Sequence, residues 1–183
     1  MEAKKGRREM KKFELTTEFI TNMFGKKLFR IKALVEFGNV KAGELGGYVE
    51  KEENVSQDGN AWVSGDAEVS GDARVSGNAW VYGNARVYGN ARVSGNAEVS
   101  GNARVSSDAD YALVQGFGTE FRCTTFYRGK NKKIMVNCGC FHGDLEGFRK
   151  QVKETRNGKI AKEYLMIADL MEYHFTSEDS SNE

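Results

Sequence analysis

Proline is absent from the 183-residue chain, and cysteine, histidine and net charge are all scarce. Without proline the turns depend on glycine, of which there are 21. Three cysteines, an odd number, argue against a disulfide scaffold and for a reducing cytosol. A net charge of +1 provides no overall field that would attract nucleic acid or an anionic membrane.

Long hydrophobic runs are missing as well. No apolar stretch approaches the roughly 20 residues that a membrane helix needs, and the start of the chain has no signal-peptide pattern. We therefore expect a cytoplasmic protein without membrane contact and without a cofactor. Its length suits one modest domain, or a solenoid with a small appendage.

What the sequence has in abundance is one six-residue repeat, Gly-Asn/Asp-Ala-x-Val-Ser/Tyr, between Gly59 and Ser106. On a strand, the Ala and Val of each hexad face one way and x faces the other. Gly-Asn or Gly-Asp then turns the corner, because these residues tolerate positive φ. A period of six predicts a parallel β-helix with a narrow core of alanine and valine. The repeated valines are Val63, Val69, Val75, Val81, Val87, Val93, Val99 and Val105.

These hexads resemble those of the hexapeptide-repeat family, whose coils usually take three hexads and wind left-handed. The pattern alone does not determine the handedness. With eighteen residues per coil, outward side chains eighteen apart stack in columns along the axis. The three columns are Trp62, Trp80 and Glu98; Glu68, Arg86 and Arg104; and Arg74, Arg92 and Asp110.

Before the hexads the chain reads Phe37-Gly-Asn-Val-Lys-Ala-Gly-Glu-Leu-Gly-Gly-Tyr-Val, and a little later Asn54-Val-Ser-Gln-Asp-Gly. This segment resembles the YdcK-type branch of the family, which includes shorter bacteriophage-encoded proteins. Val49 and Val55 are already six apart, and Gln57-Asp58 reads as a two-residue insertion in an imperfect first coil. Solenoids need atypical terminal repeats, because an open end would expose apolar surface and unpaired strand edges. The matching residues are Phe37, Val40, Lys41, Ala42, Gly43, Gly46, Gly47, Val49, Asn54, Ser56, Gln57 and Gly59.

The predicted fold class is therefore mainly β: a single-stranded parallel β-helix, left-handed by resemblance, with a small C-terminal α+β cap module. We divide the chain into five segments. They are a basic N-terminal arm and lead-in (1–27), an N-terminal cap with the irregular first coil (28–58), the regular β-helix (59–110), a β-hairpin plus two-helix module (111–175), and a disordered acidic tail (176–183).

Outside the hexads the sequence pattern that indicates secondary structure is weaker. The basic residues of positions 1–12 suit either an arm for nucleic acid or a solubilising extension, with Met10 as an alternative start. Residues 13–24 suggest a short helical turn, and Leu28–Leu34 a half-buried strand. After the hexads we expect strands at 111–115, 121–128 and 134–138, with a turn at 129–132. Asp144 can cap a first helix, and a longer helix follows Gly158.

The outward side chains form the candidate binding face. Aromatic residues beside arginines on a rigid surface favour a protein interface or self-association over nucleic acid, because Glu68 and Glu98 dilute the positive charge. The candidate residues are Trp62, Trp80, Tyr82, Tyr88, Arg74, Arg86, Arg92 and Arg104.

Catalytic and metal sites are poorly supported by the sequence. Acyltransferases of the family use a histidine to deprotonate the acceptor, but both histidines, His142 and His174, follow the coils. The group that most resembles zinc ligands comprises Cys123, Cys138, Cys140 and His142. Its Cys-x-Cys spacing is not the usual knuckle, and buried free cysteines often act as small hydrophobes. We favour no metal there.

Three functions remain open. The favoured one is a non-enzymatic binding or assembly protein, phage-type by resemblance, with a protein partner and self-association as a dimer or trimer. A counter-defence role, by binding a host immune effector such as a CRISPR nuclease or by sequestering a signalling nucleotide, is a narrower hypothesis. The alternatives are a CoA-dependent acyltransferase and a nucleic-acid-binding protein that uses its basic arm.

Overall fold

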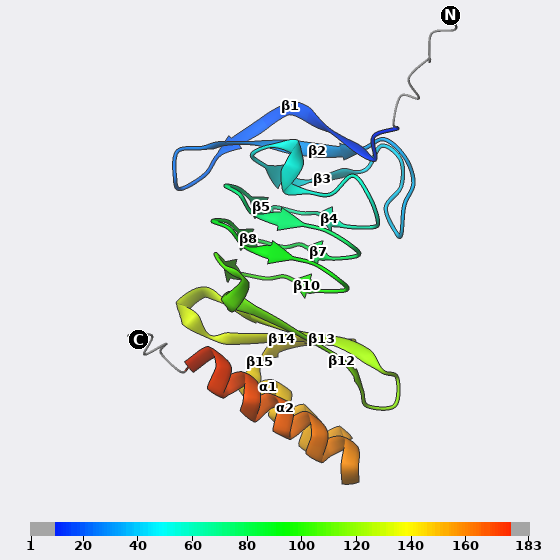
Figure 1. The fold of residues 1–183 in the computed structure, drawn as a ribbon, viewed down its shortest axis with the longest axis vertical. Coiled ribbons are helices and arrows are strands. Elements are labelled where there is room, and N and C mark those ends of the chain that lie inside the picture. The colour runs from blue at the N-terminus through cyan, green and yellow to red at the C-terminus, as the bar shows by residue number, and fades with distance from the viewer. Residues whose placement is uncertain (1–9, 177–183) are drawn as a thin grey trace, which may run out of the picture.

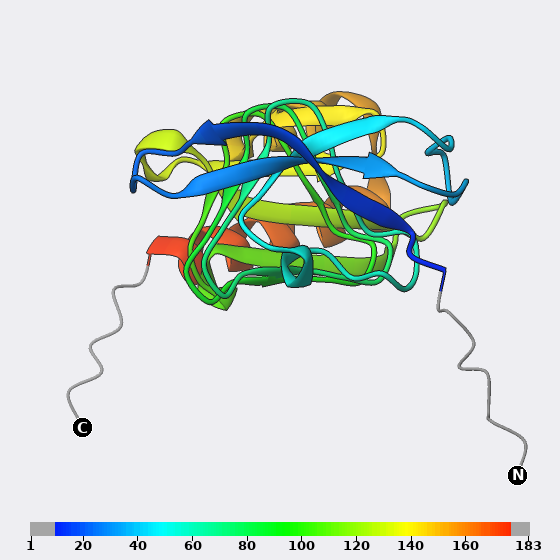
Figure 2. The same cartoon turned by 90° about the horizontal axis from the view of Figure 1, so that it is seen from above.

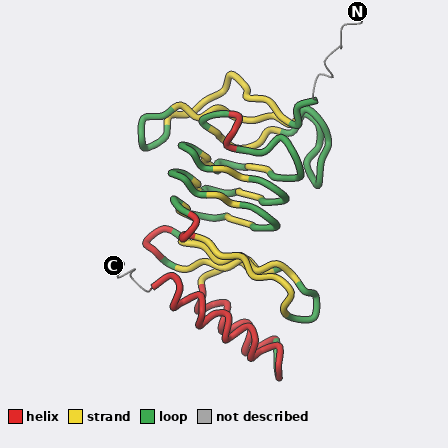
Figure 3. The backbone as a smooth tube through the Cα atoms, viewed as in Figure 1, coloured by secondary structure: helices red, strands yellow, loops and turns green. Residues whose placement is uncertain are grey.

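Three parts follow one another along the long axis of the molecule: an N-terminal cap, a stack of coils, and a C-terminal module (Figure 1). The computed structural model describes residues 10–176. The coils superpose when viewed along the axis, and the strands of the cap cross over their end (Figure 2). The helices lie at the far end, separated from the coils by a sheet (Figure 3).

The hexads form the coils, with one two-residue strand per hexad. Each coil stacks on the next in a register of eighteen, so that Trp62 lies beside Trp80 and Arg74 beside Arg92, as the sequence predicts. Every hexad alanine and valine is fully buried. The strands are β4 (Trp62–Val63), β5 (Glu68–Val69), β6 (Arg74–Val75), β7 (Trp80–Val81), β8 (Arg86–Val87), β9 (Arg92–Val93), β10 (Glu98–Val99) and β11 (Arg104–Val105).

These strands build three lateral faces. The tryptophan face consists of β4, β7 and β10, and the arginine face of β6 and β9. The extended face contains β5, β8 and β11 and continues into the N-terminal cap as one six-stranded sheet. Glycine turns the corners: Gly59 has a φ of 68°, and a Cβ there would lie 2.6 Å from the carbonyl oxygen of Gly77.

The N-terminal cap consists of β1 (Phe13–Thr21), β2 (Lys27–Ala33) and β3 (Leu45–Val49). The predicted helical turn at 13–24 is wrong, because this segment pairs with β2 as an antiparallel strand. The register shifts between Leu15 and Phe19, which interrupts the alternation of apolar residues. This interruption explains why the segment lacks the period of two that identifies a strand.

The cap also satisfies the backbone carbonyls that the first coil leaves at its open edge. On the tryptophan face, the Lys12 ammonium donates to the carbonyl oxygens of Ala61 at 2.8 Å and Gly59 at 3.3 Å. On the arginine face, the Asn54 side-chain amide does the same for Gly71 at 3.1 Å and Ala73 at 2.8 Å. On the extended face, β3 itself supplies the donors.

Part of the predicted basic arm therefore belongs to the cap. Lys12 is only 4 % exposed, and Lys11 forms an ion pair with Glu52 at 2.7 Å. The insertion residue Gln57 ties this segment to the first coil, because its side chain bonds the backbone of Lys12 and Phe13. Lys4, Lys5, Arg7 and Arg8, the other basic residues of the arm, lie outside the described residues.

The C-terminal module closes the other end with a four-stranded antiparallel sheet. Tyr127 from this sheet is fully buried in the solenoid core, and the opposite face of the sheet packs on two helices. The Asp144 carboxylate caps the first helix by accepting a hydrogen bond from Gly147 N at 2.9 Å, as predicted. The elements are β12 (Tyr111–Phe117), β13 (Arg122–Arg128), β14 (Ile134–Cys138), β15 (Phe141–Asp144), α1 (Leu145–Thr155) and α2 (Gly158–Thr176).

Two details of this module differ from the prediction. The sheet has a fourth strand, β15, which is only four residues long and follows β14 after two turn residues. Asp110 does not extend an outward column, because it pairs with Arg128 at 3.0 Å and accepts a hydrogen bond from Ser106.

Within residues 10–176 no helix has the length and apolar character to cross a membrane. The predicted tail, apart from Thr176, lies outside this range.

Candidate binding surfaces

Trp62 is not part of an exposed face, and this corrects the sequence prediction. It is 1 % exposed, with the rings of Phe37 and Phe13 at centroid distances of 5.3 and 6.2 Å. Gly46 makes this packing possible, because a Cβ at that position would lie 2.7 Å from the Trp62 ring. Trp62 does point outward from its coil, but the N-terminal cap covers that part of the first coil. Its buried indole N–H has no acceptor among the described residues.

The half-buried aromatic residues of the coils do not form one continuous surface. Trp80 is half-buried, donates its indole N–H to Ser64 Oγ at 3.0 Å and meets the Tyr82 ring at 6.0 Å. Tyr88 lies at another corner, where its ring meets Phe24 from the tip of the β1–β2 hairpin at 5.5 Å. The structure therefore contains no continuous tryptophan stripe across the described coils.

Two of the four candidate arginines are held by internal contacts on the extended face. Arg86 pairs with Glu68 at 3.0 Å. Arg104 donates to the backbone carbonyls of Ala103 at 2.8 Å and Asn84 at 3.3 Å. Burial, and after it the charge of Arg86, lowers the pKa of Arg104. These two side chains therefore help to stabilise the coils.

Arg74 and Arg92 are different, because both are exposed and neither forms an ion pair with any described residue. They lie directly opposite each other on β6 and β9 of the arginine face. Both arginines line a shallow groove of about 320 Å³, together with one serine from each of three successive coils, Ser56, Ser76 and Ser94, and one carboxylate, that of Glu53. The backbone of Arg92 is fixed by Asp108 and Tyr111, at 2.7 and 2.6 Å.

The proposed zinc ligands do not converge. Cys138 lies opposite Thr124 and Phe141 on the face of the sheet that packs on the helices. His142 lies on the other face, where its Nδ1 meets Asn137 Oδ1 and, at 3.2 Å, Ser100 Oγ. Among residues 10–176 no group of three or more His, Cys, Asp or Glu side chains is placed to hold a metal ion.

His142 instead belongs to a polar network between the module and the last coil. The Asn137 amide donates to Glu98 O at 2.9 Å, and Tyr127 Oη lies 3.1 Å from Ser100 Oγ. Burial raises the pKa of the Tyr127 hydroxyl, so it stays protonated near neutral pH. The network joins two parts of the fold, and sequence reasoning missed it because Ser100 occupies an ordinary hexad position.

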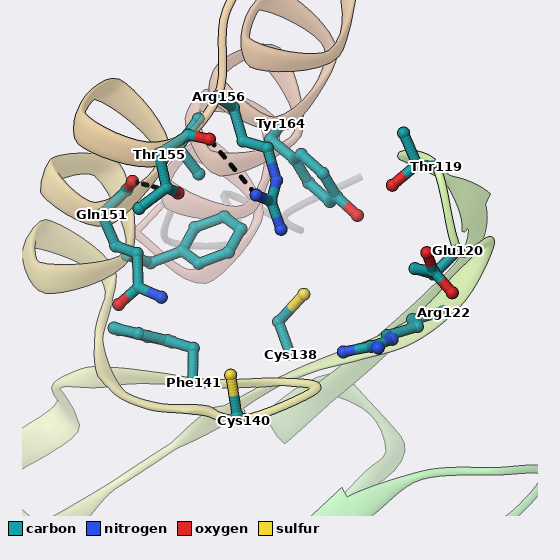
Figure 4. Close-up of a pocket in the computed structure, with 12 residues that line it drawn as sticks. Thr119, Glu120, Arg122, Cys138, Cys140, Phe141, Gln151, Thr155, Arg156 and Tyr164 are labelled. Carbon is teal, nitrogen blue, oxygen red and sulfur yellow. Dashed lines mark hydrogen bonds between the residues drawn. The ribbon is translucent and has the colours of Figure 1, made fainter.

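A cleft of about 320 Å³ lies within the C-terminal module (Figure 4). One side is formed by α1 and the start of α2, and the other by the β12–β13 turn and the residues between β14 and β15. The guanidinium groups of Arg122 and Arg156 enter from different sides, and the sulfur atoms of Cys138 and Cys140 point into the space (Figure 4). This cleft could not be predicted from the sequence, because its lining comes from four separate stretches of the chain, 119–122, 138–141, 148–156 and 164.

Comparison with protein families agrees with the geometry of the coils. The YdcK β-solenoid repeat model matches residues 67–83, 81–95 and 85–100. The coils of the chain are therefore YdcK-type hexapeptide repeats. No curated protein matches the chain.

The YdcK repeat matches cover β5 to β10 in full. They therefore include both Arg74 and Arg92, together with Trp80 and Tyr82. The N-terminal cap and the C-terminal module lie outside the matched ranges. The matched repeats thus account for the fold of the coils, while the cleft lies in a part of the chain that the matches do not reach.

Proposed function

We propose that this protein is a non-catalytic binding protein whose arginine face docks an acidic segment of a protein partner. The observation that carries the proposal is the pair Arg74 and Arg92, exposed and directly opposed without a described ion-pair partner. Like charges directly opposite each other on neighbouring strands are destabilising. A carboxylate from a partner, bound in the groove between them, would relieve this repulsion and form charge-assisted hydrogen bonds.

The coils suit such a role because they present the groove on a rigid surface. Their interior is filled by fully buried alanine and valine, and both ends are covered by dedicated modules. Little backbone order then has to be gained on binding, which lowers the entropic cost of association. The serine hydroxyls along the groove offer further hydrogen bonds to an extended peptide.

A protein partner is favoured over nucleic acid by the placement of the aromatic rings. Binding of single strands combines a basic groove with aromatic side chains on which bases stack. Here Trp80 lies on the tryptophan face with the Tyr82 ring beside it, whereas Arg74 and Arg92 lie on the arginine face. An acyltransferase is less supported, because the coils contain no histidine to deprotonate an acceptor.

The proposal is tested by reversing the charges of the groove. The protein is purified with its partner from its own host, and the complex is measured at low and moderate salt. Arg74→Glu with Arg92→Glu should abolish the complex, while Lys153→Glu with Lys162→Glu, exposed residues of α1 and α2, changes the net charge equally and should leave it intact. Equal loss in both variants, or retention in both, would refute docking on the arginine face.

Two narrower proposals concern the partner. The family resemblance suggests self-association as a dimer or trimer, which native mass spectrometry of the purified protein measures. It also suggests a phage setting, in which the partner would be a host immune effector. If the protein fails to protect phage from any defence system in a plating assay, this counter-defence role is wrong, whereas docking on the arginine face would stand.

A further inference from the structure

The cleft of the C-terminal module has an apolar wall and a charged rim. Phe148 and Val152 of α1 are buried beneath it, and Phe141 stacks beside Phe148 at a centroid distance of 5.6 Å. Tyr164 of α2 closes one side, and its hydroxyl donates to the carbonyl of Phe117 at 3.2 Å. A volume of about 320 Å³ lies at the lower end of the range of small-molecule sites.

The charge at the rim is predominantly positive. Arg122 and Arg156 both line the cleft, and neither forms an ion pair with a residue of the described range 10–176. Within the described residues, the Arg156 guanidinium donates one hydrogen bond, to the neighbouring carbonyl of Thr155 at 3.2 Å. Glu120 is the single carboxylate in the lining, and it is exposed and without an ion-pair partner among the same residues. The hydroxyl groups of Thr119 and Thr155 and the amide of Gln151 add polar groups.

The Arg122 guanidinium lies against the backbone of Gly139. Gly139 has a φ of 60°, and a Cβ at this position would lie 2.5 Å from Arg122 Nη1. The guanidinium group therefore rests directly on the turn between β14 and β15, in space that any other residue would fill. Figure 4 shows it directed toward Cys138 and Cys140, facing the side from which Arg156 enters.

We propose that this cleft binds a small organic anion. Its carboxylate or phosphate group lies between Arg122 and Arg156, and its apolar part packs against Phe141 and Phe148. Guanidinium groups match both anions in geometry and are well suited to bind them through paired hydrogen bonds. The ring pair gives the apolar part a surface, which distinguishes the expected ligand from a free inorganic ion. The site is separate from the arginine face of the coils, so either proposal can fail without the other.

The test is a calorimetric titration of the full-length protein with four probes. Phenyl phosphate and benzoate carry an anion and a ring, inorganic phosphate carries only the anion, and benzyl alcohol carries only the ring. We expect the two organic anions to bind about tenfold or more tightly than the other two, and their relative affinities to show which anion the site prefers. Equal binding of benzyl alcohol, or no binding of either organic anion, would overturn the proposal.

Four variants at the cleft and one control variant locate the site, each checked for folding by circular dichroism. Arg122→Gln and Arg156→Gln should each weaken phenyl phosphate or benzoate binding about tenfold or more, whereas Arg74→Gln on the arginine face should change nothing. Glu120→Gln should strengthen binding, because it removes a repulsive charge. Gly139→Ala should weaken binding although the charge is kept, since the added methyl group displaces Arg122. Binding unaffected by both arginine variants would show that the anion binds elsewhere.

The cysteines provide an independent readout. Cys140 is exposed and lines the cleft with Cys138. Bound phenyl phosphate or benzoate should slow the alkylation of Cys140 by N-ethylmaleimide, and Arg122→Gln should abolish this protection. Unchanged alkylation at saturating probe would contradict the assignment of the site to this cleft.

Discussion

Lys12 and Asn54 perform the same task with different side chains. Each donates hydrogen bonds to the glycine and alanine carbonyls of one hexad at the open end of the solenoid. Those carbonyls would otherwise be strand-edge acceptors buried beneath the cap, and an unpaired buried backbone group is costly. Single side chains thus replace the missing upstream coil on two of the three faces.

Asn54 can be tested by truncation. It is fully buried, and its Oδ1 also accepts a hydrogen bond from Lys51 N at 2.9 Å. Asn54→Ala leaves three backbone groups without partners and should lower the free energy of unfolding by roughly 2–5 kcal/mol. Asn90→Ala, at an exposed corner, should stay within about 0.5 kcal/mol in the same urea titration. Equal small effects would show that Asn54 does not cap the coil.

Lys12 should give the protein an unusual dependence on pH. Burial lowers the pKa of Lys12 from 10.5 to about 8, with a smaller opposing effect of Asp58. Below pH 8 the ammonium is charged in both states, and its desolvation cost is fully present. Between pH 8 and 10.5 the unfolded chain binds more protons, so stability rises with pH.

The measurement is the unfolding free energy of the wild type minus that of Lys12→Met, followed across this pH range. The subtraction removes the titration of the tyrosines, which is common to both proteins. The difference should increase by up to ~3 kcal/mol from pH 8 to 10.5. A difference that stays flat or falls would contradict the burial of a lysine with a lowered pKa.

At the scale of elements, the hexad determines which side chains face inward. Val81 lies in the middle strand of the tryptophan face and is fully buried, whereas Arg92 of β9 is exposed. Val81→Asp should unfold the solenoid, because a carboxylate would be buried without partners. Arg92→Ala should change the free energy of unfolding by no more than about 0.5 kcal/mol. A large loss in Arg92→Ala would reverse the inside–outside assignment.

The junction between the cap and the first coil depends on Trp62. Trp62→Ala should lower the free energy of unfolding by about 3–5 kcal/mol, because a fully buried indole is removed from between two rings. Trp80, one coil further along, is only half-buried, so Trp80→Ala should lower the free energy of unfolding by clearly less. Thermal or urea unfolding of the two variants ranks them directly. The opposite order would support the sequence interpretation in which both rings are exposed.

Prediction from the sequence was most successful for the hexads, because each one repeats the same pattern of inward and outward residues. The register of eighteen, the buried valines and the cap of α1 all follow from residues close in the chain. Burial of Trp62 could not be predicted, because the residues that cover it come from β1 and from Phe37, far from the hexad. The strand β1 was missed for a related reason: its bulge removes the alternation, and only its pairing with β2 defines it.

For the candidate sites too, features set by residues close in the chain were predicted, and features set by distant residues were not. Spacing correctly placed Arg74 and Arg92 side by side, since both are hexad positions. Spacing could not distinguish these two exposed arginines from Arg86 and Arg104. Arg86 pairs with Glu68 of the neighbouring coil, and Arg104 bonds a backbone carbonyl, and neither contact can be read from the repeat pattern. The cleft could not be predicted from the sequence, because the packing of the helices on the sheet brings Arg122 and Arg156 to the same site.

At the scale of the whole molecule, the solenoid is a short column whose ends are closed and whose sides differ. The extended face continues into the cap, and its arginines bond inward. The arginine face keeps two unpaired cations in a groove. The closed ends hinder the addition of further coils, because Lys12, Asn54 and β3 already bond the carbonyls at the edge of the first coil and the C-terminal sheet covers the last coil. Interaction with other molecules is thereby directed to the sides of the column and to the C-terminal module.

The arginine face is the surface that we propose binds the partner. A photoreactive amino acid placed at Ser94, which lines the groove, reports directly on what lies there in the cells that make the protein. A matched probe at Asn84, exposed at the corner between the other two faces, serves as the control. We predict a cross-link to one protein from Ser94, none from Asn84, and loss of the Ser94 product when Arg74 and Arg92 are changed to glutamate. A cross-link from Asn84 alone, no cross-link from either position, or a Ser94 product that survives the charge reversal would contradict the account.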